Sequence, residues 1–335
     1  MPKRKAGPRT IDIHAHYYSR SYLDLIAEEG KRFNATCRFT PEGFFFDTPG
    51  GSGARMPMKF IDFNERFAEM DRTGVDVHVL SLSQPMVYWA DADLSHRLAR
   101  AWNDAASEAH RAHPERILAF MTLPMLDRDR ALDELNRAAK LPGMRGVYLG
   151  TNIDGRDLDD PLFEPTFERI AQLDLPVFLH PIQQVGGKRL EFFLMHNALG
   201  FPFDTAIAAC HLIFGGVLDR HPTLKINLPH AGGVLPILIG RIDHAYRMSG
   251  AAKRIAQPPS AYLKRFTYDT ITHSKPILEW VISQVGISRI MLGSDYCFPM
   301  GTDRPVKIVD QLGLEDRQRG MILGGTAAKL LKMKP

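Results

Sequence analysis

The stretch Ile11-Asp12-Ile13-His14-Ala15-His16 decides how the rest of the chain is interpreted. Its β-prone residues lead directly into two histidines that are one residue apart. Side chains at positions i and i+2 of a strand point to the same face, so both imidazoles can reach one metal ion. A strand can also carry two histidines for structural reasons alone. Whether this pair binds a metal therefore depends on what the remainder of the chain supplies.

Composition places the chain among enzyme-sized globular proteins. It has 335 residues, of which 44% are hydrophobic and 24% are charged. This length accommodates one large α/β domain or two of ordinary size. A formal net charge of +4 is too small to indicate nucleic-acid binding, and no Lys/Arg stripe with interleaved aromatic residues is present. The charge is compatible with a small anionic substrate, and we expect no nucleic-acid partner.

Three features of the sequence favour a cytoplasmic protein. Cys37, Cys210 and Cys297 are far apart and odd in number, which predicts neither a disulfide framework nor a CxxC metal site. The basic Lys3-Arg4-Lys5 is not followed by an apolar segment of a secretory signal. The most apolar run, Ala206–Leu218, is too short to span a bilayer, so no membrane partner is expected.

Short β-rich runs alternate with amphipathic helical patterns along most of the chain. The expected strands are Thr10–His16, Val75–Leu82, Ile117–Leu123, Gly146–Leu149, Pro176–His180, Lys225–His230, Phe266–Ile271 and Arg289–Leu292. The expected helices include Phe60–Arg72, Leu94–Ala112, Arg130–Ala139, Leu162–Leu173, Thr205–Leu218 and Ile277–Val285. Strands separated by helices in this way predict an α/β fold, a (β/α)8 TIM barrel, with a doubly wound open sheet as the alternative.

Two segments depart from this repeat, although residues 1–335 are expected to form one barrel domain. Residues 17–58 contain a short helix, a Phe44-Phe45-Phe46 run and the glycine-rich Gly50–Gly53. We interpret them as a small insertion after the first strand that covers the barrel mouth. The tail beyond Tyr296 is expected to be mainly helical and to pack on the outside of the barrel.

Five side chains that can bind a metal fall at the ends of predicted strands. They are His14, His16, His180, His230 and Asp295. Barrel enzymes place their reacting groups at the carboxyl ends of the strands, so these side chains are expected on one rim. His78 lies inside a strand and is expected to be a hydrogen-bonded core residue. His273 follows the seventh strand. Two roles are open for it: it contacts the substrate, or it supports a residue of the site without contacting the substrate.

With these motifs the chain resembles the amidohydrolase superfamily, and within it the branch of the 2-amino-3-carboxymuconate 6-semialdehyde decarboxylases. The resemblance rests on Ile11–His16, His180-Pro181, Pro229–Gly233, Phe201–Thr205 and Leu292–Gly301, and it covers nearly the whole chain. It implies a distorted barrel that holds one divalent metal ion, usually Zn2+. His14, His16, His180 and Asp295 would bind the metal, and His230 would act as the catalytic residue beside the metal-bound water, together with Asp295. Neutral imidazoles and a carboxylate suit zinc.

The resemblance also suggests how a carboxylate substrate is held. An arginine after the His-Gly-Gly turn would reach the active site of the neighbouring subunit, and Arg241 matches it, which implies a homodimer. The alternative for Arg241 is an ion pair with Asp243 or with a carboxylate on the barrel rim. Arg55 is the nearest match to a second substrate arginine, although its surroundings differ. Phe193 stands where the relatives carry a tryptophan, so the substrate pocket is expected to differ from theirs.

The leading functional hypothesis is metal-dependent, cofactor-free decarboxylation of an unsaturated or aromatic carboxylic acid. A hydrolase or hydratase acting on a carboxylated ring-cleavage product uses the same ligands and remains open. A non-catalytic barrel kept for binding or assembly would be expected to lack strand-end ligands. Decarboxylases of the benzoate type in this branch carry Glu at the first position of the His-x-His pair, so His14 argues against that subgroup.

Overall fold

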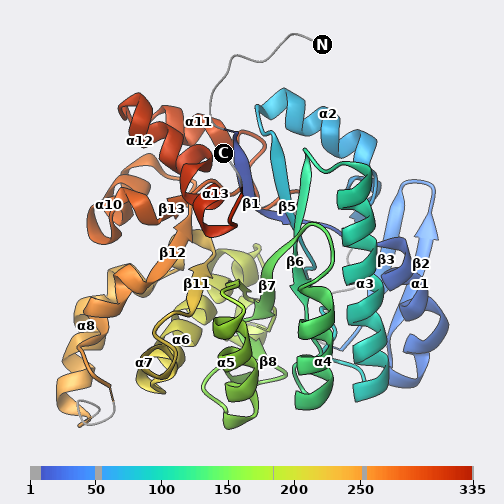
Figure 1. Cartoon of the computed structure of the whole chain (residues 1–335), viewed down its shortest axis with the longest axis horizontal. Helices are drawn as coiled ribbons and strands as arrows, with labels where there is room; N and C mark the ends of the chain where they lie inside the picture. The colour runs from blue at the N-terminus through green and yellow to red at the C-terminus, as the bar shows by residue number, and fades with distance from the viewer. Residues whose placement is uncertain (1–8, 50–54, 184, 251–254, 334–335) are drawn as a thin grey trace.

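Eight parallel strands form the centre of the protein (Figure 1). The computed structural model describes residues 9–49, 55–183, 185–250 and 255–333. The strands are ordered β1-β5-β6-β7-β10-β11-β12-β13. They comprise β1 (Ile11–His16), β5 (Val77–Ser81), β6 (Ile117–Thr122), β7 (Met144–Gly150), β10 (Pro176–His180), β11 (Lys225–Leu228), β12 (Phe266–Asp269) and β13 (Ile290–Met291).

The first and last strands meet and nearly close the sheet. Ile13 N donates to Leu292 O at 3.0 Å, and Asp295 N donates to His14 O at 2.9 Å. A single parallel bridge joins Ala15 to Tyr296. A doubly wound sheet would leave these two edges far apart, so the predicted barrel is confirmed. The barrel is distorted where β1 and β13 meet, because β13 has only two residues and the chain then leaves the sheet.

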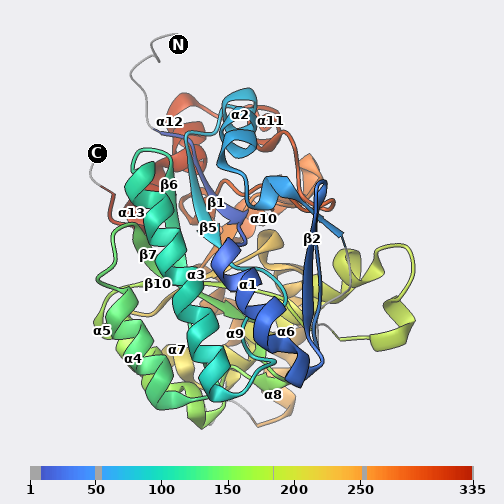
Figure 2. The same ribbon diagram turned by 90° about the vertical axis from the view of Figure 1, so that its right-hand side faces the viewer.

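Helices surround the strands (Figures 1 and 2). Those before β11 are α1 (Arg20–Glu29), α2 (Phe63–Thr73), α3 (Ala92–Ala112), α4 (Arg128–Ala138), α5 (Glu164–Gln172), α6 (Phe201–Phe214) and α7 (Val217–Arg220). Those after it are α8 (Leu235–Met248), α9 (Pro259–Tyr262), α10 (Lys275–Val285), α11 (Pro305–Asp310), α12 (Asp316–Gly320) and α13 (Thr326–Leu330). The last three form the expected helical tail.

Local chemistry explains where several elements end. The α2 helix begins at Asp62, whose carboxylate accepts from Asn64 N at 2.7 Å, and ends at Gly74 in the left-handed region. The expected helix Thr205–Leu218 is divided into α6 and α7, because Gly216 adopts a φ of 71°. The α8 helix was not among those expected from the sequence.

Residues 17–58 form α1 and an antiparallel sheet of β2 (Thr36–Thr40), β3 (Gly43–Asp47) and β4 (Arg55–Pro57). The glycine-rich Gly50–Gly53 lies outside the described residues, as does Lys3–Lys5. The rings of Phe44 and Phe46 each pack 5.5 Å from that of Tyr18, which follows β1. These contacts join the small sheet to the barrel through one hydrophobic cluster that runs from Ile11 to Leu331.

Candidate metal centre

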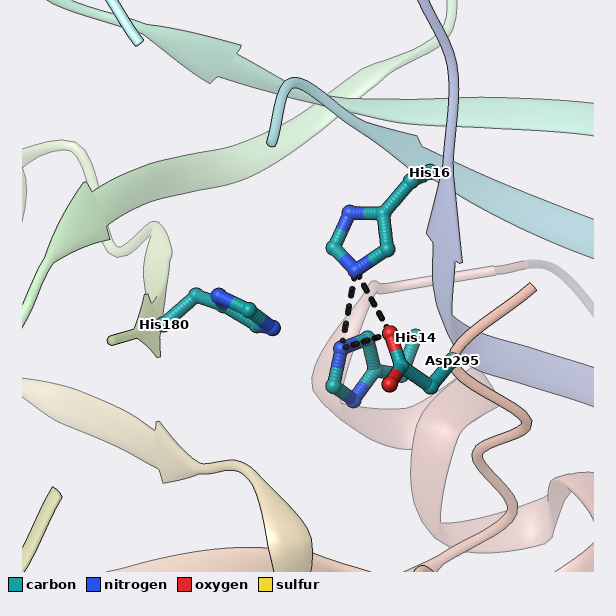
Figure 3. A group of neighbouring side chains, drawn as sticks. All are labelled: His14, His16, His180 and Asp295. Atoms are coloured by element: carbon teal, nitrogen blue, oxygen red, sulfur yellow. Dashed lines mark hydrogen bonds and ion pairs between the residues drawn. The ribbon is translucent and has the colours of Figure 1, made fainter. Parts of the chain in front are cut away.

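Four side chains from three separate parts of the barrel converge at the carboxyl ends of the strands (Figure 3). They are His14 and His16 from β1, His180 from the end of β10, and Asp295 from the loop after β13. Each offers one ligand atom, and these atoms all lie within 4.8 Å of one another. All four residues are buried. The four metal ligands implied by the resemblance are therefore brought together by the fold.

Hydrogen bonds fix which nitrogen of each imidazole faces the centre. His14 Nδ1 lies 2.8 Å from Asp269 Oδ2, and His180 Nδ1 lies 2.9 Å from the Pro181 carbonyl. His16 Nδ1 lies 3.1 Å from Ser81 Oγ. A carboxylate and a carbonyl can only accept, so Nδ1 of His14 and of His180 carries the proton, and the serine hydroxyl allows the same state for His16. The Nε2 lone pairs are then directed into the shared space.

This arrangement fits a divalent cation. His14 Nε2 and His16 Nε2 are 3.1 Å apart, and His16 Nε2 is 3.0 Å from Asp295 Oδ1. Two lone pairs and a carboxylate at these distances repel one another unless a proton or a cation lies between them. His180 Nε2 is buried and has no hydrogen-bond partner among the described residues. Imidazole nitrogens and a carboxylate oxygen are ligand types that zinc binds, and the orphaned nitrogen would gain a partner on metal binding.

The pKa shifts of three of the four candidate ligands, His16, His180 and Asp295, are consistent with this interpretation. Burial raises the pKa of Asp295, but the neighbouring histidines lower it by a larger amount, so its net value lies below the usual one. Burial lowers the pKa of His180 well below its usual value, and the nearby His16 adds to this effect. Burial lowers the pKa of His14, but its hydrogen bond with Asp269 and the charge of Asp295 raise it above the usual value, so metal binding must displace a proton from His14.

Asp269 supports this centre and was missed in the sequence. It is the last residue of β12, and its carboxylate is fully buried. One oxygen accepts from His14 Nδ1 and His230 N, and the other accepts from Ala231 N and Ile271 N. Because it ends a strand next to the other strand-end residues, its position alone was a usable signal. The carboxylate orients His14 and also holds the turn that carries His230.

Two further buried residues with charged side chains, Asp12 and Arg66, form hydrogen bonds with the backbone of the candidate ligands. Asp12 Oδ1 accepts from His14 N and from Ser294 N, which ties β1 to the loop that carries Asp295. Arg66 on α2 is fully buried and donates through Nη2 to the His16 carbonyl at 2.6 Å. The same guanidinium lies 3.2 Å from His78 Nδ1, so His78 is a hydrogen-bonded core residue, as expected.

His230 lies beside the four ligands rather than among them. Its Nε2 is 3.9 Å from Asp295 Oδ2, and its Nδ1 has no hydrogen-bond partner in the described part of the chain. The chain leaves β11 at Leu228, and His230 adopts a φ of 52° in the turn that follows. Burial lowers the pKa of His230, with a further lowering by His14. A neutral imidazole with an unengaged nitrogen can accept and return a proton.

A cavity of about 220 Å³ opens next to His230 and Asp295. Its other lining residues are mostly apolar and come from the segments after β10, β12 and β13 and from α6, α8 and α10; they include Phe201, Ile237, Ile271, Ile277, Trp280 and Met300. His273 also lines this cavity. No lysine or arginine is found among the described residues that line it.

The other three expected substrate residues lie away from this cavity within the same chain. Arg241 is exposed on α8 and forms no ion pair with any residue that the structure describes, and Asp243 accepts instead from Ser260 N. Arg55 pairs with Glu42 at 3.1 Å on the small sheet. Phe193 is 91% exposed on the segment between β10 and α6, which extends away from the barrel (Figure 2).

Comparison with known proteins places this barrel in a family. Residues 11–333 match the amidohydrolase family model, and the chain belongs to that family. It is 29% identical, over 97% of this chain and 92% of the relative, to 2-amino-3-carboxymuconate-6-semialdehyde decarboxylase of Dictyostelium discoideum. The family resemblance inferred from the motifs is confirmed.

Solved structures agree with the fold. Metarhizium anisopliae IDCase superimposes with a TM-score of 0.84 at 26% identity, covering 97% of each chain. The 5-carboxyvanillate decarboxylase of Sphingomonas paucimobilis gives 0.83 at 27% identity, covering 98% of this chain and all of that one. A dihydroxybenzoic acid decarboxylase of Polaromonas, with a TM-score of 0.77, 24% identity and 97% coverage of both chains, was solved with manganese and the inhibitor 2-nitroresorcinol.

Proposed function

We propose that this chain is a metal-dependent carboxy-lyase that removes carbon dioxide from an unsaturated or aromatic carboxylic acid without an organic cofactor. The observation that carries the proposal is the convergence of three imidazole Nε2 atoms and Asp295 beside His230, at the edge of a mainly apolar cavity. The activities named for the relatives support the same reaction class. The cavity volume suits a small planar acid better than a polymer.

We propose Zn2+ as the native metal, held by His14, His16, His180 and Asp295. Three neutral imidazoles and one carboxylate match the usual zinc donor set, whereas manganese commonly takes more oxygen ligands. A bound divalent cation supplies Lewis acidity and lowers the pKa of water at the site. Metal analysis of protein isolated without added metal tests the assignment, and stoichiometric manganese in place of zinc would contradict it.

In the proposed reaction the bond between the carboxylate carbon and the substrate framework breaks, and a C–H bond forms at the same framework carbon. The substrate anion and one proton yield carbon dioxide and the protonated product, so no oxidant or reductant is needed. His230 moves the proton, because it lies at the cavity edge with an unengaged nitrogen. The apolar walls exclude water and favour loss of the charged carboxylate as a neutral gas. His273 contacts the substrate from the neighbouring loop, which follows β12.

The test is a panel of carboxylated dienes and phenols, with carbon dioxide release measured against water consumption. Carbon dioxide released in proportion to substrate lost would support the proposal, and hydration or hydrolysis without carbon dioxide would replace it with the hydrolase alternative. His230→Ala should retain its metal and lose about 10²- to 10⁴-fold in turnover, the usual contribution of a general acid–base residue. Full activity in this variant would exclude His230 from the proton transfer.

We propose further that the enzyme is a homodimer in which Arg241 binds the substrate carboxylate of the partner subunit. No lysine or arginine is found among the described residues that line the cavity, and Arg241 forms no ion pair with any residue in the described ranges. Of the 14 residues of α8, only Leu235 and Pro236 are buried. Ile237 and Met248 on this helix are 60% and 74% exposed. A second copy would cover this apolar face and bring a guanidinium, which can bind a carboxylate through two hydrogen bonds.

Mixing two inactive variants tests the exchange of arginines. A dimer formed from one His230→Ala chain and one Arg241→Ala chain carries one intact site if the arginine acts in the partner subunit. Random exchange at equal concentrations should then restore about a quarter of the wild-type activity, since half of the dimers are mixed and each has one working site of two. If Arg241 acts within its own chain, the mixture stays inactive.

We propose that the enzyme works in the cytoplasm. All three cysteines are free, which agrees with a reducing compartment. In the part of the chain that the structure describes, one helical stretch, His196–Phe214, is long and apolar enough to cross a membrane by length and composition alone. Half of that window is buried against the rest of the protein, as in an internal helix.

A further inference from the structure

A second cavity lies at the opposite end of the barrel from the metal centre. Its volume is about 510 Å³. It is bounded by the start of β11 at Lys225, by Thr267 near the start of β12, by Arg289 just before β13, and by α13. The α13 helix lies beside β13 (Figure 1). The metal ligands lie at the carboxyl ends of the strands, so the two cavities open at different ends.

The charged side chains that line this second cavity are all cationic in the described part of the chain. Its lining includes the cations Lys225, Arg265, Arg289 and Lys329, and no described aspartate or glutamate lines it. The walls between these cations are apolar, with Ile226, Met321 and Leu330. Four like charges around one hollow repel one another and create a positive potential, which an anion relieves.

Two of the four cations are available to a ligand. Lys225 forms an ion pair with Asp174, which also pairs with Lys332 at 2.7 Å. Arg265 donates to the Pro222 carbonyl at 2.9 Å. Among the residues in the described ranges, no ion pair or side-chain hydrogen bond involves Arg289 or Lys329.

The register of the strands places two lining residues of this cavity, Lys225 and Thr267, on the interior face of the barrel. Phe178 pairs with Asn227, and Asn227 pairs with Thr267. The ring of Phe178 packs 4.9 Å from that of His14, so this row of residues faces the inside of the barrel. Lys225 is two residues before Asn227 and therefore shares its face.

Asn227 is a buried polar residue that adjoins the cavity through its hydrogen bond with Thr267. The residue is 1% exposed, and its Nδ2 has no hydrogen-bond partner in the described structure. Its Oδ1 accepts from Thr267 Oγ1 at 3.1 Å, and Thr267 itself lines the cavity. A buried amide donor without an acceptor costs free energy, although Asn227 does not itself line the cavity and adjoins it only through Thr267.

We infer that this cavity is a binding site for a small organic carboxylate, separate from the catalytic centre. Arg289 and Lys329 bind the carboxylate group, and the apolar walls formed by Ile226, Met321 and Leu330 contact the hydrocarbon part. Pockets that bind small molecules commonly have volumes of about 300–1,000 Å³ and combine apolar walls with a few charged groups. The site goes beyond the proposed decarboxylation and does not depend on it.

Calorimetric titration of the metal-loaded protein with benzoate tests this site. We expect a binding event that Arg289→Gln and Lys329→Gln each weaken about 10-fold or more, the usual effect of losing one charge-assisted hydrogen bond. Arg317→Gln is the matched control, because Arg317 is exposed on α12 and does not line the cavity. The metal content of all three variants should equal that of the wild type. Lys329 is exposed, so its replacement does not disturb folding.

Two results would overturn the inference. Benzoate binding that is unchanged in both Arg289→Gln and Lys329→Gln would show that the cavity is not the site. Inorganic phosphate binding there as tightly as benzoate would show a general oxyanion site and contradict the organic class of ligand. Phosphate binding at least 10-fold more weakly, because it lacks an apolar part, would support that class.

Discussion

Asp269→Asn should release the metal by changing the tautomer of His14. The four N–H groups that the carboxylate accepts lie 2.8, 3.0, 2.9 and 3.1 Å away, from His14, His230, Ala231 and Ile271. An asparagine has one acceptor oxygen in place of two. Its amide nitrogen must therefore face either His14 and His230 or the other pair, and both pairs are donors.

The first orientation is the less costly one. It leaves the His230 N–H without an acceptor, at a cost of about 1–3 kcal/mol, while His14 adapts by moving its proton to Nε2. The second orientation leaves two buried backbone N–H groups unpaired, at about 2–6 kcal/mol. In the first orientation, the proton on His14 Nε2 points at the position of the metal. Loss of such an orienting carboxylate commonly costs about 10- to 100-fold in metal affinity.

Zinc titration and urea unfolding of the metal-free protein measure the two effects separately. We expect zinc affinity to fall at least about 10-fold and the stability of the metal-free variant to fall by about 1–3 kcal/mol. Asp160→Asn is the control, because Asp160 caps a remote turn and asparagine caps equally well. Zinc affinity within twofold of the wild type in Asp269→Asn would refute the tautomer argument.

Three further predictions concern stability. Burial raises the pKa of Asp204 to about 6 in spite of its hydrogen bonds with Thr151 and Asn152, so its ionisation costs stability as the pH rises from about 4 through 6. The stability of Asp204→Asn, measured by urea unfolding, should therefore increase relative to wild type by up to about 3 kcal/mol between pH 4 and 7.5. Parallel pH profiles of the two proteins would contradict this prediction. Arg66→Met leaves the His16 carbonyl without its buried donor and should lower the free energy of unfolding by about 1–3 kcal/mol or more in urea. An unchanged urea midpoint would show that this hydrogen bond is dispensable. Removal of metal with a chelator should lower the midpoint of thermal unfolding, and added zinc should raise it again as the zinc concentration increases. A midpoint that neither chelator nor zinc changes would argue against a metal in the folded state.

The periodicity of the sequence was enough to predict the barrel. Strands β1, β6, β10 and β12 lie within or close to their expected ranges, because runs of apolar, β-branched and aromatic residues buried on both faces form a local signal. The same logic placed His14, His16 and His180 together, since His16 and His180 end their strands, His14 shares the face of His16, and parallel strands end on one rim. These predictions need only the alternation of side chains along a strand and the topology of the barrel.

Long-range contacts decided the rest. Nothing local to Asp269 indicates that its carboxylate accepts four N–H donors from β1 and two turns, and nothing local to Arg66 indicates that it is buried behind His16. Arg289 and Lys329 are 40 positions apart in the sequence and line one cavity only because α13 returns to the start of the last strands. Hydrogen-bond partners and cavities depend on which elements pack together, and this is set by burial over the whole chain rather than by any one segment.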